Sequence, residues 1–234
     1  MMKKLHFIAQ SKGGVGKSLL MYLMALKNHH KENCLFVDMD ASTFTSRRQL
    51  SFVDEDKLDT VSLLNERAAI QRDNLFVYLD KLSRSRYQEV YIDLGAPESE
   101  QLPALIEFDD VQLPLREFAD DMDIEFHIVI GGAGAYNASV EYLLKMVKVV
   151  RDDFKITVWE SVTGFRKFPE LAKELAENCE NMGITFRRFG DFEPETYVGT
   201  EILSGVSKGL ALEDYDRGPR KRLIRELDIN FRYD

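Results

Sequence analysis

Glycines, lysines and a serine near the start of the chain are spaced for binding phosphate. Residues 10–18 read QSKGGVGKS, close to the phosphate-loop pattern G-x-x-x-x-G-K-[ST]. Ser11 replaces the first glycine of that pattern, and a second lysine, Lys12, follows it. The segment lies between an apolar run and the apolar stretch LLMYLMAL, a strand–loop–helix setting typical of a phosphate loop. The sequence therefore predicts a nucleotide site.

The residue types in this loop have distinct chemical roles. Glycines let the backbone turn tightly so that its N–H groups point at phosphate oxygens, and the following helix adds its positive dipole end. Lys17 is expected to neutralise the β- and γ-phosphates of ATP, and the Ser18 hydroxyl to bind Mg²⁺. The predicted nucleotide contacts form one segment: Gly13, Gly14, Val15, Gly16, Lys17, Ser18 and Leu19.

Carboxylates stand at the ends of two further apolar runs. Asp38 and Asp40 close the run LFVDMD, and Asp93 lies at the end of EVYIDL. In a doubly wound sheet the carboxyl ends of the strands lie beside the phosphate loop. The order of the three motifs along the chain therefore supports a site for a nucleotide together with Mg²⁺.

The pattern K-G-G-x-G-K-[ST], with Lys12 as its first lysine, resembles the deviant Walker A motif of the ParA/MinD family of P-loop ATPases. The resemblance is concentrated in residues 8–97, which also contain a DxD segment and a Walker B-like strand. It implies that Lys12 reaches across an ATP-bound homodimer to the partner's nucleotide, where its charge stabilises the transition state. It also implies that Asp40 orients the attacking water, Asp38 supports the metal and Asp93 binds Mg²⁺ through a water.

The resemblance implies a Mg-ATP-dependent switch that dimerises with ATP, hydrolyses it slowly and responds to a protein activator. Plasmid or chromosome partition, or plasmid transfer, is the process expected. Two alternatives stay open. A metabolic ATP-dependent ligase or amidase would need a pocket for a second substrate. A nucleotide-binding module without turnover would suit the departures from the family: residues 41–42 read AS where the ParA branch has Pro-Gln, and residues 95–97 read GAP after the Walker B-like strand.

Six apolar runs alternate with segments of helical periodicity. The expected strands span residues 5–9, 34–38, 89–94, 125–130, 155–161 and 184–189. The expected helices span residues 18–27, 75–83, 102–108, 136–150 and 169–182. This alternation indicates a doubly wound α/β fold, in which helices cover both faces of a mostly parallel sheet. A weaker strand is expected at 111–115, and without repeats or linkers residues 1–234 are expected to form one P-loop ATPase domain.

Charge and apolar patterning exclude some classes of protein. With 31 Lys and Arg against 40 Asp and Glu, the chain is acidic, which excludes a protein coated in basic charge. No apolar run approaches the ~18 residues of a membrane span, and the run at residues 5–9 is too short for a signal peptide. Cys34 and Cys179 lie in unrelated settings, which indicates reduced thiols. A cytoplasmic protein is expected.

The C-terminal segment is basic although the whole chain is acidic. Residues 217–227 read RGPRKRLIREL, and a helix is expected near 219–227. In the ParA branch such residues bind DNA without sequence preference, whereas in the MinD branch a terminal amphipathic helix binds membrane. The apolar stripe of Leu223, Ile224 and Leu227 is small, which favours DNA over membrane and would equally dock the helix on its own domain. Docking, DNA binding and membrane binding stay open here.

Two other segments could lie near a nucleotide. Residues 130–137, IGGAGAYN, follow a strand but do not match G-x-G-x-x-G and have no evident acidic ribose partner, so a tight strand–helix turn is expected. Residues 191–195, DFEPE, are the candidate for enclosing the adenine, because the loop after the last strands does so in related enzymes.

Overall fold

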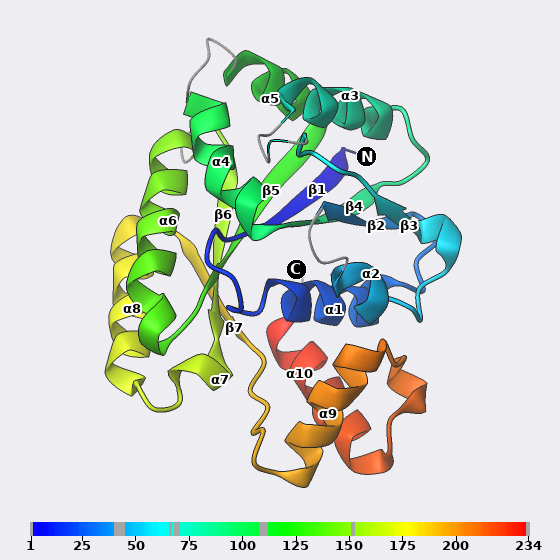
Figure 1. Ribbon diagram of the computed structural model, residues 1–234, viewed down its shortest axis with the longest axis vertical. Coiled ribbons are helices and arrows are strands. Elements are labelled where there is room, and N and C mark those ends of the chain that lie inside the picture. Colours follow the sequence, from blue (N-terminus) through cyan, green and yellow to red (C-terminus); the bar gives the residue numbers. More distant parts are fainter. Residues whose placement is uncertain are drawn as a thin grey trace.

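The centre of the molecule is a parallel sheet of seven strands in the order β3-β2-β4-β1-β5-β6-β7 (Figure 1). The computed structural model describes residues 2–39, 45–65, 67, 71–107, 112–150 and 153–232. Every strand pair within these residues is parallel, which confirms the predicted fold class. β1 lies between β4 and β5, where the strand order reverses, and ligands bind α/β sheets at such a reversal.

The strands are apolar because helices cover both faces of the sheet. Their bounds are β1 (Lys3–Ala9), β2 (Cys34–Met39), β3 (Leu58–Thr60), β4 (Glu89–Leu94), β5 (Met122–Ile130), β6 (Lys155–Ser161) and β7 (Thr185–Phe189). The helices are α1 (Lys17–Asn28), α2 (Thr45–Gln49), α3 (Arg72–Ser83), α4 (Ala96–Glu107), α5 (Gln112–Ala119), α6 (Tyr136–Val150), α7 (Val162–Phe165), α8 (Pro169–Met182), α9 (Tyr197–Lys208) and α10 (Arg217–Asn230). Short 3₁₀ turns occur at Glu55–Lys57, Ala133–Ala135 and Leu212–Asp214.

Two hydrophobic cores lie on opposite faces of the sheet. Successive residues of β1 belong to different cores, Phe7 to the first and Ile8 to the second, as the period of a strand requires. The first core contains buried residues of α3, α4, α5, α6 and α8, and the second contains those of α1, α9 and α10 (Figure 1). None of the helices in the described part of the chain combines the length and apolar character needed to cross a bilayer.

The expected elements mostly coincide with observed ones. The six main expected strands overlap β1, β2, β4, β5, β6 and β7, and the expected helices overlap α1, α3, α4, α6 and α8. The strand expected at 111–115 is wrong, because Gln112–Ala119 form helix α5. Pro114 is tolerated there since the first N–H groups of a helix have no intrahelical partner. The sequence analysis did not predict β3 or α9.

Candidate functional site

The phosphate-loop segment connects the end of β1 to the start of α1. Gly14 and Gly16 have φ angles of 75° and 108°, in the left-handed region that favours glycine. Helix α1 begins at Lys17, directly after Gly16, so its N-terminal N–H groups face the loop. The loop therefore has the tight turn and the helix start on which phosphate binding depends.

The two lysines of the loop differ in burial. Lys17 is 9% exposed, and its ammonium group donates a hydrogen bond to the carbonyl oxygen of Gln10 at 3.0 Å. Lys12 is exposed, as is the neighbouring Gly13. A buried lysine across the loop suits a contact within its own subunit, whereas an exposed lysine suits a contact with a second molecule.

Oxygen ligands converge beside the start of α1. The Ser18 hydroxyl donates to Oδ2 of Asp93 at 3.1 Å, and Asp93 is 2% exposed. Asp38 is the register partner of Asp93 on the neighbouring strand, is 3% exposed and accepts a hydrogen bond from the Arg47 backbone N–H at 3.1 Å. A hydroxyl and carboxylates are the donor set that Mg²⁺ prefers. The residues expected to hold the metal thus lie at one edge of the sheet.

The underside of the loop rests on the glycine-rich turn that follows β5. Val15 is 5% exposed, and a Cβ at Gly131 would lie 2.8 Å from Cγ1 of Val15. A Cβ at Gly132 would lie 2.2 Å from the carbonyl oxygen of Gly164, so neither glycine leaves room for a side chain. Residues 131–135 therefore support the phosphate loop, as a tight turn rather than a second nucleotide site.

Gln10 is a site residue that the sequence analysis missed. Its side chain is buried, and its amide nitrogen donates to the carbonyl oxygens of Val129 at 2.9 Å and Ser139 at 3.2 Å. Its amide oxygen accepts from the backbone N–H of Lys12 at 3.2 Å, and its own backbone N–H donates to Oγ of Ser99 at 3.1 Å. Gln10 thereby anchors the loop to β5, α6 and α4. The only signal in the sequence is a polar residue directly after a buried strand.

Two further predictions for the site concern the attacking water and the adenine. Asp40, the expected water-orienting carboxylate, lies outside the described residues. Residues 191–193 of the segment expected to enclose the adenine line a cavity of ≈ 300 Å³, together with Arg166 and Arg222.

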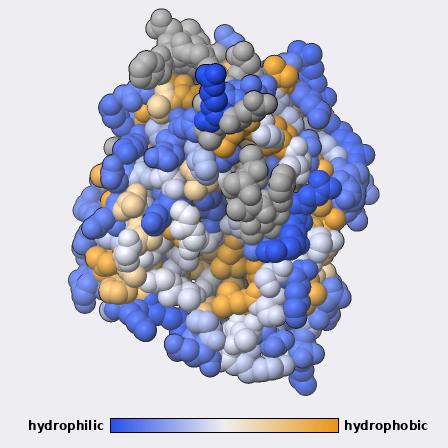
Figure 2. All heavy atoms as spheres, viewed as in Figure 1, coloured by the Kyte–Doolittle hydropathy of each residue, from blue (hydrophilic) through white to orange (hydrophobic). Residues whose placement is uncertain are grey.

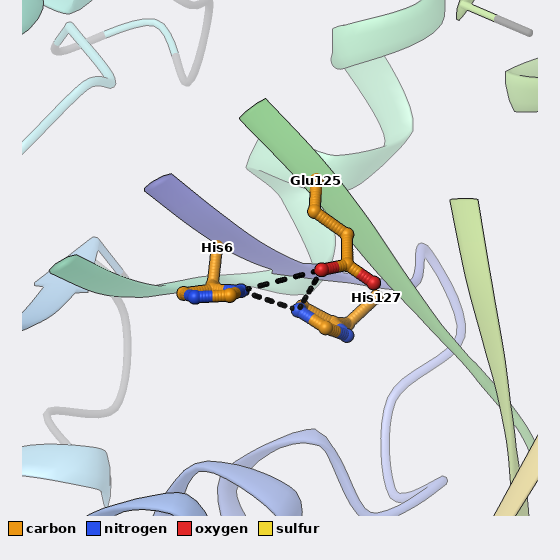
Figure 3. Close-up of side chains that lie close together, drawn as sticks. All are labelled: His6, Glu125 and His127. Carbon is orange, nitrogen blue, oxygen red and sulfur yellow. Dashed lines mark hydrogen bonds and ion pairs between the residues drawn. The ribbon is translucent and has the colours of Figure 1, made fainter. Parts of the chain in front are cut away.

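A cluster of potential metal ligands lies on one face of the sheet, between the neighbouring strands β1 and β5. His6 on β1 and Glu125 and His127 on β5 turn their polar groups toward one another (Figure 3). Nδ1 of His6 lies 2.9 Å from Nε2 of His127, and Oε2 of Glu125 lies 3.6 and 3.8 Å from these two nitrogens. The ring of His6 also stacks on Tyr91 at 4.7 Å between centroids.

The hydrogen bonds of this cluster assign its protons and disfavour a metal. Nε1 of Trp159, which can only donate, lies 3.0 Å from Nδ1 of His127. Nδ1 of His127 therefore accepts, and the proton of the neutral ring is on Nε2, the atom that faces His6 and Glu125. A metal at this point would require both ring nitrogens of His127 to be deprotonated, whereas ligating histidines normally keep an N–H on the other nitrogen. The cluster is a hydrogen-bonded network that joins β1, β5 and β6.

This network makes the stability of the fold depend on pH. Burial lowers the pKa of His6 and of His127 to about 3. Because these folded-state values lie below the ordinary value near 6.5, their contribution is fully present above pH 6.5 and is lost as the pH falls toward 3. In urea titrations between pH 7.5 and 4.5, each histidine should contribute a slope of about 1.4 kcal/mol per pH unit below pH 6.

The variant His6→Gln should reduce that slope by the share of one histidine. His30→Gln, at an exposed position, is the matched control and should keep the wild-type slope. Equal slopes in wild type and His6→Gln would contradict a neutral, buried His6.

No protein-family model and no curated protein matches the chain in sequence. Solved structures do match in fold. A putative plasmid partition protein from Borrelia burgdorferi B31, bound to AMPPNP, superposes with a TM-score of 0.53 at 16% identity, over 97% of this chain and 98% of that one. The MinC:MinD cell division complex of Aquifex aeolicus gives 0.52 at 11% identity, over 95% and 96%. A ParA family ATPase from Chlorobium tepidum TLS gives 0.50 at 16% identity, over 96% and 98%. The chain therefore has the fold of the ParA and MinD ATPases.

Proposed function

We propose that this protein is a Mg-ATP-dependent dimerising switch ATPase of the ParA/MinD type, which hydrolyses ATP to ADP and phosphate. The observation that carries the proposal is the joining of three motifs at one edge of the sheet. The glycine turn places Lys17 at the start of α1, and Ser18 bonds directly to Asp93 at the end of β4. This arrangement supplies backbone donors, a cation and oxygen ligands for a nucleoside triphosphate and its metal.

Each residue of the site has a separate role in phosphoryl transfer. The loop N–H groups and the N-terminus of α1 bind phosphate oxygens, and Lys17 exchanges the carbonyl of Gln10 for the phosphates. Ser18, with Asp93 and Asp38 behind it, would hold Mg²⁺, which would neutralise the negative charge that develops during phosphoryl transfer. Asp40 orients the attacking water.

Lys12 is the residue that couples ATP hydrolysis to dimerisation. Because Lys12 is exposed beside the loop, a second subunit can receive its ammonium group at the γ-phosphate. A cation that arrives only with the partner couples turnover to dimerisation, as an arginine finger does. ATP binding thus favours the homodimer, and hydrolysis returns it to monomers. A protein activator would act on this slow step.

Helix α10 is the proposed surface for DNA. Of its apolar stripe, Leu223 and Leu227 are buried against the domain, which agrees with docking of the helix, whereas Ile224 is 39% exposed. Arg217, Lys221 and Arg225 remain exposed on the opposite side. A dimer would present two such faces, and avidity would make a weak, salt-sensitive contact with phosphate dependent on ATP. The proposed process is plasmid or chromosome partition, or plasmid transfer. Membrane binding is the weaker proposal, since Leu223 and Leu227 of the apolar stripe are used for docking and Ile224 alone remains exposed in that stripe.

Replacing Asp40 with alanine tests the reaction. The variant should bind Mg-ATP with wild-type affinity, because Asp40 is assigned to the water and not to the phosphates. Its hydrolysis should fall by about 100-fold, within the range that loss of a positioned acid–base group produces, and the protein should remain in the ATP-bound dimer. Phosphate release and nucleotide binding are measured on the same preparation.

Asp121→Ala, at an exposed position before β5, is the control and should hydrolyse ATP normally. Unchanged turnover in Asp40→Ala would show that another group orients the water. A wild type that binds ATP without any turnover would favour the nucleotide-binding module, and ATP cleavage only with a second substrate would favour the metabolic enzyme.

A further inference from the structure

The segment that follows β7 borders the phosphate loop. Gly190 has a φ of 73°, and a Cβ there would lie 3.3 Å from Cδ2 of Leu19 in the first turn of α1. A Cβ at Gly16 would likewise lie 3.3 Å from Cζ of Phe189, the last residue of β7. A displacement of residues 189–190 would therefore change the packing of the loop and of the first turn of α1.

Helix α10 holds the other side of this segment through one buried carboxylate. Glu226 is 1% exposed, and its Oε1 accepts the backbone N–H of Gly190 at 2.8 Å and the side-chain amide of Asn230 at 3.0 Å. Nη1 of Arg222, one turn earlier in α10, donates to Oε2 of Glu226 at 3.4 Å. Removing a buried carboxylate that accepts a backbone N–H strongly destabilises the fold, because its hydrogen-bond partners are left unpaired.

Arg222 extends the contact by one residue along the segment. Its Nη2 donates to the carbonyl oxygen of Asp191 at 2.6 Å and to Oδ2 of Asp191 at 3.1 Å. The other carboxylate oxygen of Asp191 accepts from Nη2 of Arg166 at 2.6 Å, and Arg166 also pairs with Glu193. Arg222, although it belongs to the basic C-terminal segment, is thus held in this hydrogen-bond network. It does not contribute to the exposed basic residues Arg217, Lys221 and Arg225.

A third set of bonds fixes the backbone of the segment from α7, the short helix that follows β6. Oγ1 of Thr163 donates to the carbonyl oxygens of Gly190 at 2.5 Å and Phe192 at 3.0 Å. Residues 190–193 therefore contact three parts of the domain: the phosphate loop, α7 and α10. Among these supports, α10 carries the exposed basic residues Arg217, Lys221 and Arg225.

We infer that Glu226 and Arg222 are positioning residues of the nucleotide site, and that the docking of α10 is energetically coupled to nucleotide binding. This inference rests on the proposed function and adds a route by which the basic helix responds to the nucleotide within one subunit. The coupling free energy is reciprocal: if nucleotide binding tightens α10 on residues 190–191, then loosening α10 must weaken nucleotide binding by the same factor. Both directions are measurable.

The experiment compares Arg222→Ala and Glu226→Gln with wild type, using ADP and ATP as probes in calorimetric titrations. Both variants should raise the Kd of both nucleotides about 5- to 20-fold, within the usual range of coupling between sites. The losses for ADP and ATP should be equal, because the segment borders the loop and the start of α1 and is not assigned to the γ-phosphate. Glu201→Gln, the same acid-to-amide change at an exposed position of the neighbouring helix α9, should leave both Kd values unchanged.

Amide hydrogen exchange of residues 217–230, with and without ADP, reads the coupling in the other direction. In wild type, saturating ADP should slow exchange across α10, and the slowing should vanish in Arg222→Ala. A merely structural role would lower the protection of α10 in the variants but would leave the response to ADP intact. Should a variant not fold, the wild-type exchange alone decides.

Wild-type binding of ADP with no change in α10 exchange, or with unaltered Kd values in both variants, overturns this inference and leaves the proposed function standing. A wild type that binds neither ADP nor ATP overturns both.

Discussion

Alanine in place of Lys17 is expected to weaken the binding of Mg-ATP by about 100-fold, the loss that removal of strong charge-assisted hydrogen bonds produces. The ammonium group of Lys17 already lies across the loop on the carbonyl of Gln10, so it needs only to exchange partners when phosphates enter. Alanine leaves the backbone donors of the loop in place but removes the cation assigned to the phosphates in its own subunit. ADP binding should fall less than ATP binding, because the γ-phosphate is absent.

The measurement is a calorimetric titration of both nucleotides, with urea unfolding of the free protein as a check on folding. Losing the bond to Gln10 should lower the free energy of unfolding by about 1 kcal/mol, which leaves the fold intact. Lys4→Ala, at the exposed start of β1, removes an equal charge at the opposite end of that strand from the loop and should bind ATP normally. Wild-type ATP affinity in Lys17→Ala would mean that the loop does not hold the triphosphate.

The second large effect is expected from Lys12→Ala. Since Lys12 is exposed and is assigned to the partner's nucleotide, the variant should bind ATP as a monomer with an affinity close to wild type. It should fail to form the productive dimer, and its turnover should drop by about 1,000-fold, as on loss of a cation supplied in trans. The residual hydrolysis per site should be independent of protein concentration, whereas wild-type hydrolysis should rise with it.

Mixing experiments separate a role in trans from a role in cis. Adding Lys17→Ala, which keeps Lys12 but binds ATP only weakly, to Lys12→Ala should restore part of the turnover if a single Lys12 acts across the interface. Loss of nucleotide binding in Lys12→Ala as severe as in Lys17→Ala would instead place Lys12 in the site of its own subunit.

Local sequence patterns were sufficient for the parts of the site that are contiguous in the chain. The glycine spacing before Lys17 predicted a strand–loop–helix segment, and acidic residues at the ends of apolar runs predicted carboxylates beside that loop. In the structure Asp38 and Asp93 lie in register across β2 and β4. Ser18 bonding to Asp93 follows from the same logic, because parallel strands place their carboxyl ends at one edge.

Contacts between distant residues could not be predicted in this way. His6 and His127 are 121 residues apart, and their network depends on strand register that no single segment encodes. Glu226 is 36 residues from Gly190, and nothing in the basic C-terminal segment indicates the contact between them. The error at residues 112–115 has a different cause: a short apolar run with a proline fits a strand edge or a helix start equally well, and packing of Leu115 in the core decides between them.

The measurement that tests the central claim most directly is the mass of the wild-type protein in solution, determined by size-exclusion chromatography with light scattering. With Mg-ADP the 27.0 kDa chain should elute as a monomer, and with Mg-ATP or Mg-AMPPNP its mass should double. A monomer with all three nucleotides, or a dimer that ignores the nucleotide, would contradict an ATP-dependent dimerising switch.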